Sequence, residues 1–326
     1  MPSRLNPNAV IECVPNFSEG TDEGKVASIV AAMQVEGVRL LDWSLDVAHN
    51  RSVVTIAGTP AGVFESAVRG VGRAAQLIDL TRQKGEHPRI GAADVVPFVP
   101  VSGASLAECA MLARQAGLEI WRRHGIPVYF YEAAAARPDR VNLEDVRRGQ
   151  FEGLRETAHR DAARRPDVGG PEVHPTAGAS AVGARSFLIA YNIFLNSPQT
   201  AGQAGSGLPL AAQADIAAAR AVARAIRASA GGLPGVKAIG VGVRGRAQVS
   251  MNITNFRATP MARVHDKVRE LARANGAVAA EGEIIGLIPQ EAYDPQAEWL
   301  SEIPNFDPEA KVLELMLEHP LPWPAG

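Results

Sequence analysis

The loop Lys84–Asp94 is the most unusual stretch of this 326-residue chain, because an acid, a base, a cation and a histidine lie close together in it. Histidine can exchange a proton near neutral pH, and a neighbouring carboxylate such as that of Glu86 can orient and tune it. The stretch therefore predicts that His87 transfers protons in a reaction. Residue types alone leave a second interpretation open, in which His87 is an ordinary histidine of a surface loop.

Two further polar clusters have the composition of anion-binding sites. In Asp46–Ser52, Arg51 offers a planar fork for a carboxylate, and His49 and Asn50 offer hydrogen bonds. The other cluster, Asn16–Gly20, leads into a predicted helix, and the backbone N–H groups at the start of a helix attract anions. The alternatives are an ordinary hairpin loop for the first cluster and a capped turn for the second.

A long stretch from about Arg137 to Ala184 separates the two halves of the chain, and its middle, Asp167–Gly178, has neither helical nor strand periodicity. Irregular segments of this length in compact proteins are usually functional or disordered. Its glycines permit a close approach of the backbone to a ligand, and its prolines restrict its freedom. We predict a binding loop, with a flexible linker as the alternative. It shares the spacing His-Pro-x-x-Gly-Ala with the loop at His87; we interpret this as coincidence, although both copies could face one cleft between the halves.

These polar segments must be positioned by regular elements. Apolar, β-branched runs bounded by glycine, proline or asparagine predict strands, and longer segments with a 3.6-residue period predict helices. Thr59-Pro60 and the capping box Ser105–Glu108 mark two helix starts in the first half, and Pro97 and Pro100 indicate a strand at a sheet edge or with a bulge. The first half thus has predicted strands at residues 10–14, 38–43, 51–57, 94–101 and 128–132, and predicted helices at residues 22–35, 59–80 and 105–124.

The second half repeats the order of the first. Its helix start at Thr259-Pro260 resembles Thr59-Pro60, and Asn275-Gly276 ends the same helix. Each half reads β-α-β-β-α-β, with one helix and one strand added to the first, which predicts an α+β fold of two ferredoxin-like (βαββαβ) halves with mixed sheets and helices packed on one face. The predicted elements here are strands at residues 185–195, 236–243, 247–254 and 283–288, and helices at residues 210–230 and 259–275.

Composition and length limit the class of protein. A hydrophobic content of 46% with 21% charged residues is typical of a globular chain, and the length favours two cores. The net charge of −2 and the lack of a long basic run argue against a nucleic-acid partner. The sequence shows neither a secretory leader nor an apolar run that could cross a bilayer, so we expect a cytoplasmic protein with no membrane partner. Cys13 and Cys109 lie in apolar runs and are predicted to be reduced core thiols.

Metal and nucleotide cofactors are not expected. The seven histidines include no His-x-His or His-x-x-x-His pair, and the two cysteines are far apart in the sequence. The chain also lacks the sequence Gly-x-x-x-x-Gly-Lys-Ser/Thr, and no Gly-x-Gly-x-x-Gly opens a helix after a strand.

Taken together, five short segments resemble the signatures of the formiminotransferase family. They occur in the family's order, and the resemblance runs from about Ile11 to Gln290. Each segment alone is weak, whereas their joint occurrence is specific. The segments are Glu12–Gly20, Asn50–Val53, Gly85–Ala92, Gly183–Asn192 and Gln248–Asn252.

The resemblance implies a transferase that moves a formimino group from N-formimidoyl-L-glutamate to N5 of tetrahydrofolate, a step of histidine degradation and one-carbon metabolism. Tetrahydrofolate would be a co-substrate, and His87 the catalytic residue. Residues 1–187 would form the N-terminal subdomain and residues 188–326 the C-terminal subdomain, in a homodimer. Because the chain stops at Gly326, we expect no cyclodeaminase activity. The folate-binding segment of the family falls on Gly169, Gly170, Pro171, Glu172, Val173, His174, Pro175, Thr176, Ala177 and Gly178.

Two anionic substrates require cations and hydrogen-bond donors in the site. The predicted donor-binding residues are Asn16, His49, Asn50, Arg51 and Arg89. Animal members of the family carry a tryptophan where this chain has Ala177, so stacking on the folate ring would be weaker or come from elsewhere, and a tryptophan at this position would tighten folate binding. Two alternatives remain, namely a related transferase that uses N-formylglutamate and a non-catalytic folate-binding protein of the same fold.

Overall fold

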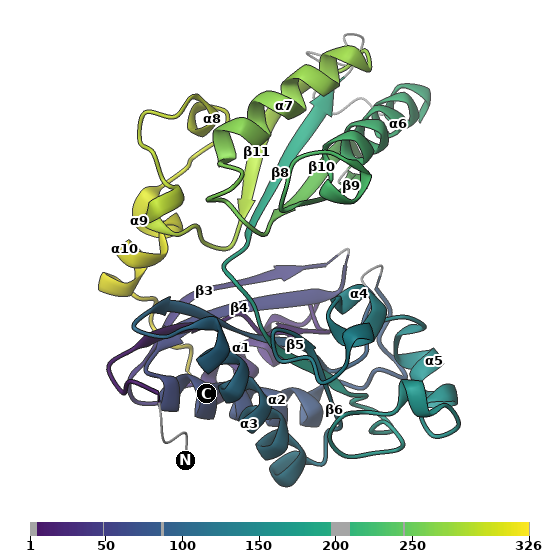
Figure 1. The fold of residues 1–326 in the computed structure, drawn as a ribbon, viewed down its shortest axis with the longest axis vertical. Coiled ribbons are helices and arrows are strands. Elements are labelled where there is room, and N and C mark those ends of the chain that lie inside the picture. Colours follow the sequence, from purple (N-terminus) through teal and green to yellow (C-terminus); the bar gives the residue numbers. More distant parts are fainter. Residues whose placement is uncertain (1–4, 48, 86–87, 197–208, 244, 326) are drawn as a thin grey trace. The chain divides into compact units, whose positions relative to one another are not determined.

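The structure is a computed structural model that describes residues 5–47, 49–85, 88–196, 209–243 and 245–325. Its contacts divide the chain into two compact units (Figure 1). The first contains the residues up to Ser186 and a C-terminal segment that begins at Pro320, and the second is Phe187–His319. Each unit has its own sheet, helices and hydrophobic core, which confirms the predicted α+β class with two halves. The subdomain limits 1–187 and 188–326 stay a prediction, and the sequence does not predict that the C-terminal segment returns to the first unit.

The sheet of the first unit has seven strands, and β1 and β2 lie one after the other between β4 and β5. β3 pairs with the other edge of β4, and β7 and β6 extend the sheet in parallel from β5. The strands are β1 (Val10–Cys13), β2 (Asn16–Phe17), β3 (Val38–Asp46), β4 (Arg51–Gly58), β5 (Ala93–Ser102), β6 (Val128–Glu132) and β7 (Ser180–Ala184).

Three helices, α1 (Glu23–Ala32), α2 (Pro60–Leu77) and α3 (Leu106–His124), cover one face of this sheet (Figure 1). Successive side chains of a strand point to opposite faces. In β4, Val54 and Ile56 belong to the hydrophobic core beneath the helices, so Arg51 points to the opposite face. This alternation places Arg51 and Thr55 on the face opposite the helices.

The second unit has a four-stranded antiparallel sheet in the order β11-β8-β10-β9. The first unit repeats this pairing as β5-β1-β4-β3, also antiparallel. The chain order is β-α-β-β-α-β in both, and the ferredoxin-like assignment stays our interpretation of this pattern. Helices α6 and α7 cover one face of the second sheet (Figure 1). The elements are β8 (Ile189–Asn196), α6 (Pro209–Ile226), β9 (Val236–Val243), β10 (Arg246–Ile253), α7 (Met261–Ala274), β11 (Val278–Ile285), α8 (Glu298–Ser301), α9 (Pro308–Lys311) and α10 (Leu313–Glu318).

The prediction that β5 is an edge strand is wrong, and the alternative, a bulge, is confirmed. β5 has β1 and β2 on one side and β7 on the other. Asn16 pairs with Val95 and Phe17 with Ala93, so the register passes over Asp94. The carbonyl of Pro97 accepts a hydrogen bond from the backbone N–H of Val14 at 3.3 Å. A bulge of this kind redirects a side chain, here that of Asp94.

Several element boundaries differ from the prediction. The stretch from Arg137 to Ala184 is not only a loop, because it contains α4 (Leu143–Val146), α5 (Gln150–Thr157) and β7. The strand predicted at residues 185–195 begins later, as β8, and the one predicted at residues 283–288 lies earlier, as β11. Helical segments this short have little periodicity, so tertiary contacts decide whether they form.

The two Thr-Pro helix starts are not equivalent. The Thr59 hydroxyl accepts the N–H of Gly62 at 3.3 Å and caps α2 as predicted. The N-cap of α7 is Pro260, and the Thr259 hydroxyl instead donates to the carbonyl of Pro234 at 2.7 Å. The predicted cap at Thr259 is therefore wrong. The hydroxyl of Thr259 is buried next to the carbonyl of Pro234 and donates to it instead of capping the helix.

Replacement of Thr59 by alanine should lower the free energy of unfolding of the first unit by about 1 kcal/mol, because the N–H of Gly62 loses its acceptor. Thr59→Ser keeps the hydroxyl and should stay close to the wild type. Urea denaturation of the three proteins measures the difference, and equal losses for the alanine and serine variants would contradict the capping role.

Candidate functional site

Glu86 and His87 lie outside the residues that the structure describes. The described part of the site consists of the residues on either side of Glu86 and His87 and of the segments that contact those residues. Gly85 is two residues before His87, and Arg89 is two residues after it. Both flanks are fixed by contacts with distant parts of the first unit.

Asn50, at the turn between β3 and β4, joins three segments of the first unit. Its side-chain oxygen accepts the N–H of Gly20 at 2.9 Å, and its side-chain amide donates to the carbonyl of Lys84 at 2.8 Å. Its own carbonyl accepts the side-chain amide of Gln83 at 3.0 Å. The backbone of Asn50 has φ +47°, a left-handed conformation that asparagine tolerates better than most residues. One residue thus connects the Asn16–Gly20 segment with the loop that carries His87.

Two glycines allow these segments to approach. A Cβ added at Gly20 would collide with the backbone of Arg51 and Asp46, and one added at Gly85 would collide with the carbonyl of His49. Side chains at these two positions would push the three segments apart. The close packing of these segments therefore requires glycine at positions 20 and 85.

Arg51 points away from the helix-covered core and donates to the side-chain oxygen of Asn16 on β2. Its Nε is buried and has no hydrogen-bond partner. Burial, followed by the nearby positive charge of Arg147, lowers the pKa of Arg51 from 12.5 to about 10. The guanidinium is consequently still charged at neutral pH, in surroundings that do not fully compensate it.

His49 lies at the exposed tip of the same hairpin. Its N–H donates to Asp46 Oδ1 at 3.0 Å, and its Nδ1 lies 2.7 Å from Asp46 Oδ2. The ring is thus oriented by a carboxylate, an arrangement that fixes a histidine tautomer. His49 and Arg51 share this hairpin, as the sequence predicts.

Asp94 connects the bulge of β5 with α4. Its Oδ1 accepts the N–H of Ile90 at 2.8 Å, and its Oδ2 forms an ion pair with Arg147, the C-cap residue of α4. The Asp94 side chain is 3% exposed and that of Arg147 13% exposed. Arg147 is not among the residues predicted from the sequence, because nothing in its local pattern indicates a partner 53 residues away.

Arg89 is already surrounded by acceptors of the protein. Its Nε donates to Gln83 Oε1 at 2.6 Å, and its Nη2 donates to the carbonyl of Gln83 at 3.1 Å and to Glu152 Oε1 at 3.0 Å. Its Nη1 faces Gln150 and Glu152. These contacts do not support the predicted role of Arg89 in donor binding. We infer that Arg89 anchors the loop between Gln83 and Ile90.

The predicted folate segment returns to the same region at its end. The carbonyl of Ala177 accepts the N–H of Ala92 at 2.9 Å, and the N–H of Ala179 donates to Ile90 at 2.9 Å. The carbonyl of Thr176 accepts the N–H of Leu80 at 2.8 Å. These backbone bonds join residues 176–179 to both sides of the loop that carries His87.

The start of that segment has different surroundings. Gly169 has φ +76°, and a Cβ there would collide with the ring of Trp121. Gly170, Pro171 and Glu172 are exposed, and Val173 is buried. The exposed part is thus available to a ligand, while its two ends are fixed.

The Ala177 side chain is 1% exposed and belongs to the first core. A tryptophan at this position would have to enter a closely packed core, which is normally destabilising. The expectation that Ala177→Trp provides a stacking surface for folate is therefore not supported by the burial of this residue.

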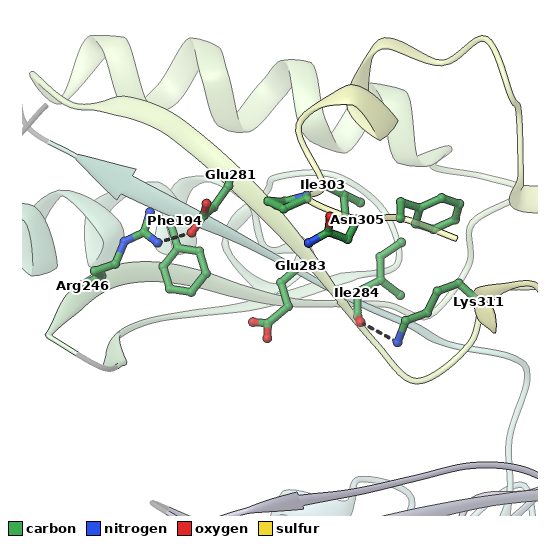
Figure 2. A pocket seen from close by; sticks show the side chains of 11 residues that line it. Phe194, Arg246, Glu281, Glu283, Ile284, Ile303, Asn305 and Lys311 are labelled. Carbon is green, nitrogen blue, oxygen red and sulfur yellow. Dashed lines mark hydrogen bonds and ion pairs between the residues drawn. The ribbon is translucent and has the colours of Figure 1, made fainter. Parts of the chain in front are cut away.

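The second unit has a cavity of about 350 Å³ beside β8, β10 and β11 (Figure 2). Arg246 stacks on Phe194 at 4.2 Å and forms an ion pair with Glu281. Gln248, from the fifth family-like segment, donates to Glu283 at 3.2 Å. The charges that Figure 2 shows are thus partly engaged with one another.

Among the described residues, no group of three or more histidine, cysteine, aspartate or glutamate side chains is placed to hold a metal ion. Both cysteines are buried and unpaired, as predicted. No helix in the described part of the chain is long and apolar enough to cross a membrane.

Two family models match the chain. The model described as "Formiminotransferase domain, N-terminal subdomain" matches residues 10–185, and the one described as "Formiminotransferase domain" matches residues 209–302. Glutamate formimidoyltransferase of Streptococcus pyogenes is 41% identical over 94% of this chain and 97% of its own length. Glutamate formimidoyltransferase of Thermoplasma acidophilum is 40% identical over 95% and 98%. Formimidoyltransferase-cyclodeaminase of Mus musculus is 36% identical over 87% of this chain and 51% of its own length.

The turn at His174 should open on acidification. The Nδ1 of His174 accepts the N–H of Ala177 at 3.0 Å, and burial lowers the pKa of His174 below 6.5. Because the open form binds the proton more readily, stability of the turn is complete above pH 6.5 and falls as the pH drops toward the lowered pKa. The protection of the Ala177 amide, corrected for intrinsic exchange, should fall by at most about tenfold per pH unit.

His174→Asn is the matched control, because its side-chain oxygen can accept the same N–H without titrating. Its protection should be independent of pH in this range. A wild-type profile as flat as that of the variant would refute the role of His174 in the turn.

Proposed function

The chain belongs to the formiminotransferase family, and we propose that it transfers the formimidoyl group of N-formimidoyl-L-glutamate to N5 of tetrahydrofolate. The products are 5-formimidoyltetrahydrofolate and L-glutamate. Tetrahydrofolate is thus a co-substrate. The same relationship leads us to propose a cytoplasmic homodimer that takes part in histidine degradation and one-carbon metabolism.

The observation that best supports this function is the meeting of family-like segments in the first unit. Asn50 connects Gly20 with Lys84, and the hydroxyl of Ser18 donates to the carbonyl of Gly91 at 2.7 Å. The predicted folate segment joins the same loop through Ala177. Segments that are far apart in the sequence therefore contact the described residues on either side of His87, as a site for two substrates requires.

The reaction needs one proton to be taken up and one to be supplied. As N5 of tetrahydrofolate forms a bond to the formimidoyl carbon, its proton passes to His87. The tetrahedral carbon then expels the nitrogen of glutamate, and that nitrogen receives the proton from His87. A histidine with a pKa near neutrality can perform both steps. Since the proton returns, the enzyme ends each cycle in its starting state.

Donor binding is assigned to Asn16, His49, Asn50 and Arg51, and folate binding to Gly169–Gly178. Arg51 is the cation of this set, and a guanidinium matches a carboxylate of the glutamate donor. Asn16 holds the guanidinium from β2, and Asn50 holds the surrounding segments. The exposed residues of the folate segment are Gly169–Glu172 and Pro175.

His87→Ala should lower the turnover number by about two to four orders of magnitude, while the dissociation constant for tetrahydrofolate changes little. Steady-state assays at saturating donor and folate measure the turnover number, and equilibrium binding measures the affinity. His319→Ala, at an exposed histidine of the second unit, is the control and should retain full turnover. A His87→Ala variant with near-normal turnover would exclude the acid–base role.

Arg51→Ala should weaken donor binding by roughly 1.5–3 kcal/mol, because a charge-assisted hydrogen bond to a carboxylate is lost. The Michaelis constant for the donor should rise more than that for tetrahydrofolate. If Arg51 only supports the hairpin, the melting temperature should fall while the Michaelis constant for the donor stays unchanged, and the assignment is then wrong.

A further inference from the structure

Two arginines of the first unit share one buried, incompletely compensated charge cluster. Arg51 comes from the start of β4 and Arg147 from the end of α4. Arg51 donates to the side chain of Asn16, and Arg147 pairs with Asp94, which precedes Val95, the strand partner of Asn16. The Nε atoms of both are buried and have no hydrogen-bond partner. Asp94 forms an ion pair with Arg147, whereas Arg51 has the neutral oxygen of Asn16.

Unpaired buried donors are uncommon in folded proteins, and each costs free energy unless a partner is supplied. The two positive charges are also not fully balanced by carboxylates. Besides Asp94, the carboxylate near Arg51 is that of Asp46, which is half-exposed at the hairpin, so solvent screens its charge. Arg89 illustrates the opposite case, since protein acceptors surround its guanidinium. The cluster of Arg51 and Arg147 thus has donors and positive charge available for a further acceptor.

We propose that Arg147 is a second donor-binding residue, which joins Arg51 in holding one carboxylate group of the glutamate donor. Asp94 positions Arg147 for this contact. The inference rests on the proposed function and adds a specificity-determining residue to it. A guanidinium fork pairs with a planar carboxylate through two parallel hydrogen bonds, which an ammonium group cannot reproduce.

The ion pair with Asp94 orients Arg147 because the carboxylate is itself held by the N–H of Ile90 at 2.8 Å. Ile90 is in turn three residues from His87 and bonded to Ala179. The position of Arg147 is thereby connected to the loop of the proton-transfer residue. This connection explains why a residue outside every family-like segment belongs to the site.

The test compares Arg147→Lys with the wild type. The lysine keeps the positive charge that Asp94 requires and removes the planar fork. We expect the Michaelis constant for N-formimidoyl-L-glutamate and the dissociation constant of L-glutamate to rise about tenfold or more. The Michaelis constant for tetrahydrofolate and the melting temperature should stay close to the wild-type values. Arg148→Lys, at the neighbouring residue that is 77% exposed and pairs with Asp145, is the matched control and should change none of these.

A second comparison uses Arg51→Lys alone and together with Arg147→Lys. If both arginines hold the same carboxylate, the double variant should lose less affinity than the product of the two single losses. Independent, multiplicative losses would overturn the shared contact. Unchanged donor and glutamate constants in Arg147→Lys, or a rise confined to tetrahydrofolate, would overturn the assignment of Arg147.

Binding of L-glutamate is measured by calorimetry without any turnover. A wild-type protein that binds glutamate but transfers no formimidoyl group would refute the proposed function, and the effect of Arg147→Lys on glutamate binding would still decide the role of Arg147. If Arg147→Lys folds poorly, Arg147→Gln supplies the same measurements, with glutamate affinity equal to the wild type as the contradicting result.

Discussion

The hydrogen bonds of Asn50 are the contacts on which the polar site of the first unit depends. A single side-chain amide satisfies a backbone donor of one segment and a backbone acceptor of another, Gly20 and Lys84. The turn that presents it needs a left-handed residue, and asparagine combines that backbone preference with both hydrogen-bonding groups. Glycine at positions 20 and 85 removes the side chains that would keep the segments apart. Asn50, Gly20 and Gly85 therefore provide both the backbone conformation and the hydrogen bonds that hold these segments together.

Arginines around this centre differ in how completely the protein satisfies them. Glutamine, glutamate and backbone acceptors surround the guanidinium of Arg89, and these hydrogen bonds stabilise the loop between Gln83 and Ile90. Arg51 and Arg147 retain buried nitrogens without partners. Since the cost of an unpaired buried donor is removed when a ligand provides the acceptor, the unsatisfied arginines are the better candidates for substrate contacts. Residue type alone does not distinguish Arg89, Arg51 and Arg147 as candidates for substrate binding, whereas their hydrogen bonds do.

Local patterns in the sequence predict most of the regular elements. The cap at Thr59, the capping box at Ser105 and the left-handed Gly125 that ends α3 follow the predicted boundaries, because each depends on residues within one helical turn. Features that depend on distant partners are predicted poorly. Thr259 has the same local signal as Thr59, but a carbonyl from another segment binds its hydroxyl. Ala177 lies in the predicted folate segment, but the sequence does not predict that its side chain is buried in the core. Arg147 lies outside every predicted site segment, but it pairs with Asp94. In each case the deciding contact is tertiary.

In the proposed reaction, the first unit assembles a site that transfers an intact one-carbon group between two substrates. The most direct measurement uses N-formimidoyl-L-glutamate labelled with ¹³C in the formimidoyl carbon, followed by NMR with purified protein and tetrahydrofolate. Our account predicts that the label moves to N5 of the folate as one equivalent of L-glutamate appears. Label that remains on glutamate, or that is released to water while tetrahydrofolate stays unchanged, would contradict it, as would transfer from N-formyl-L-glutamate alone.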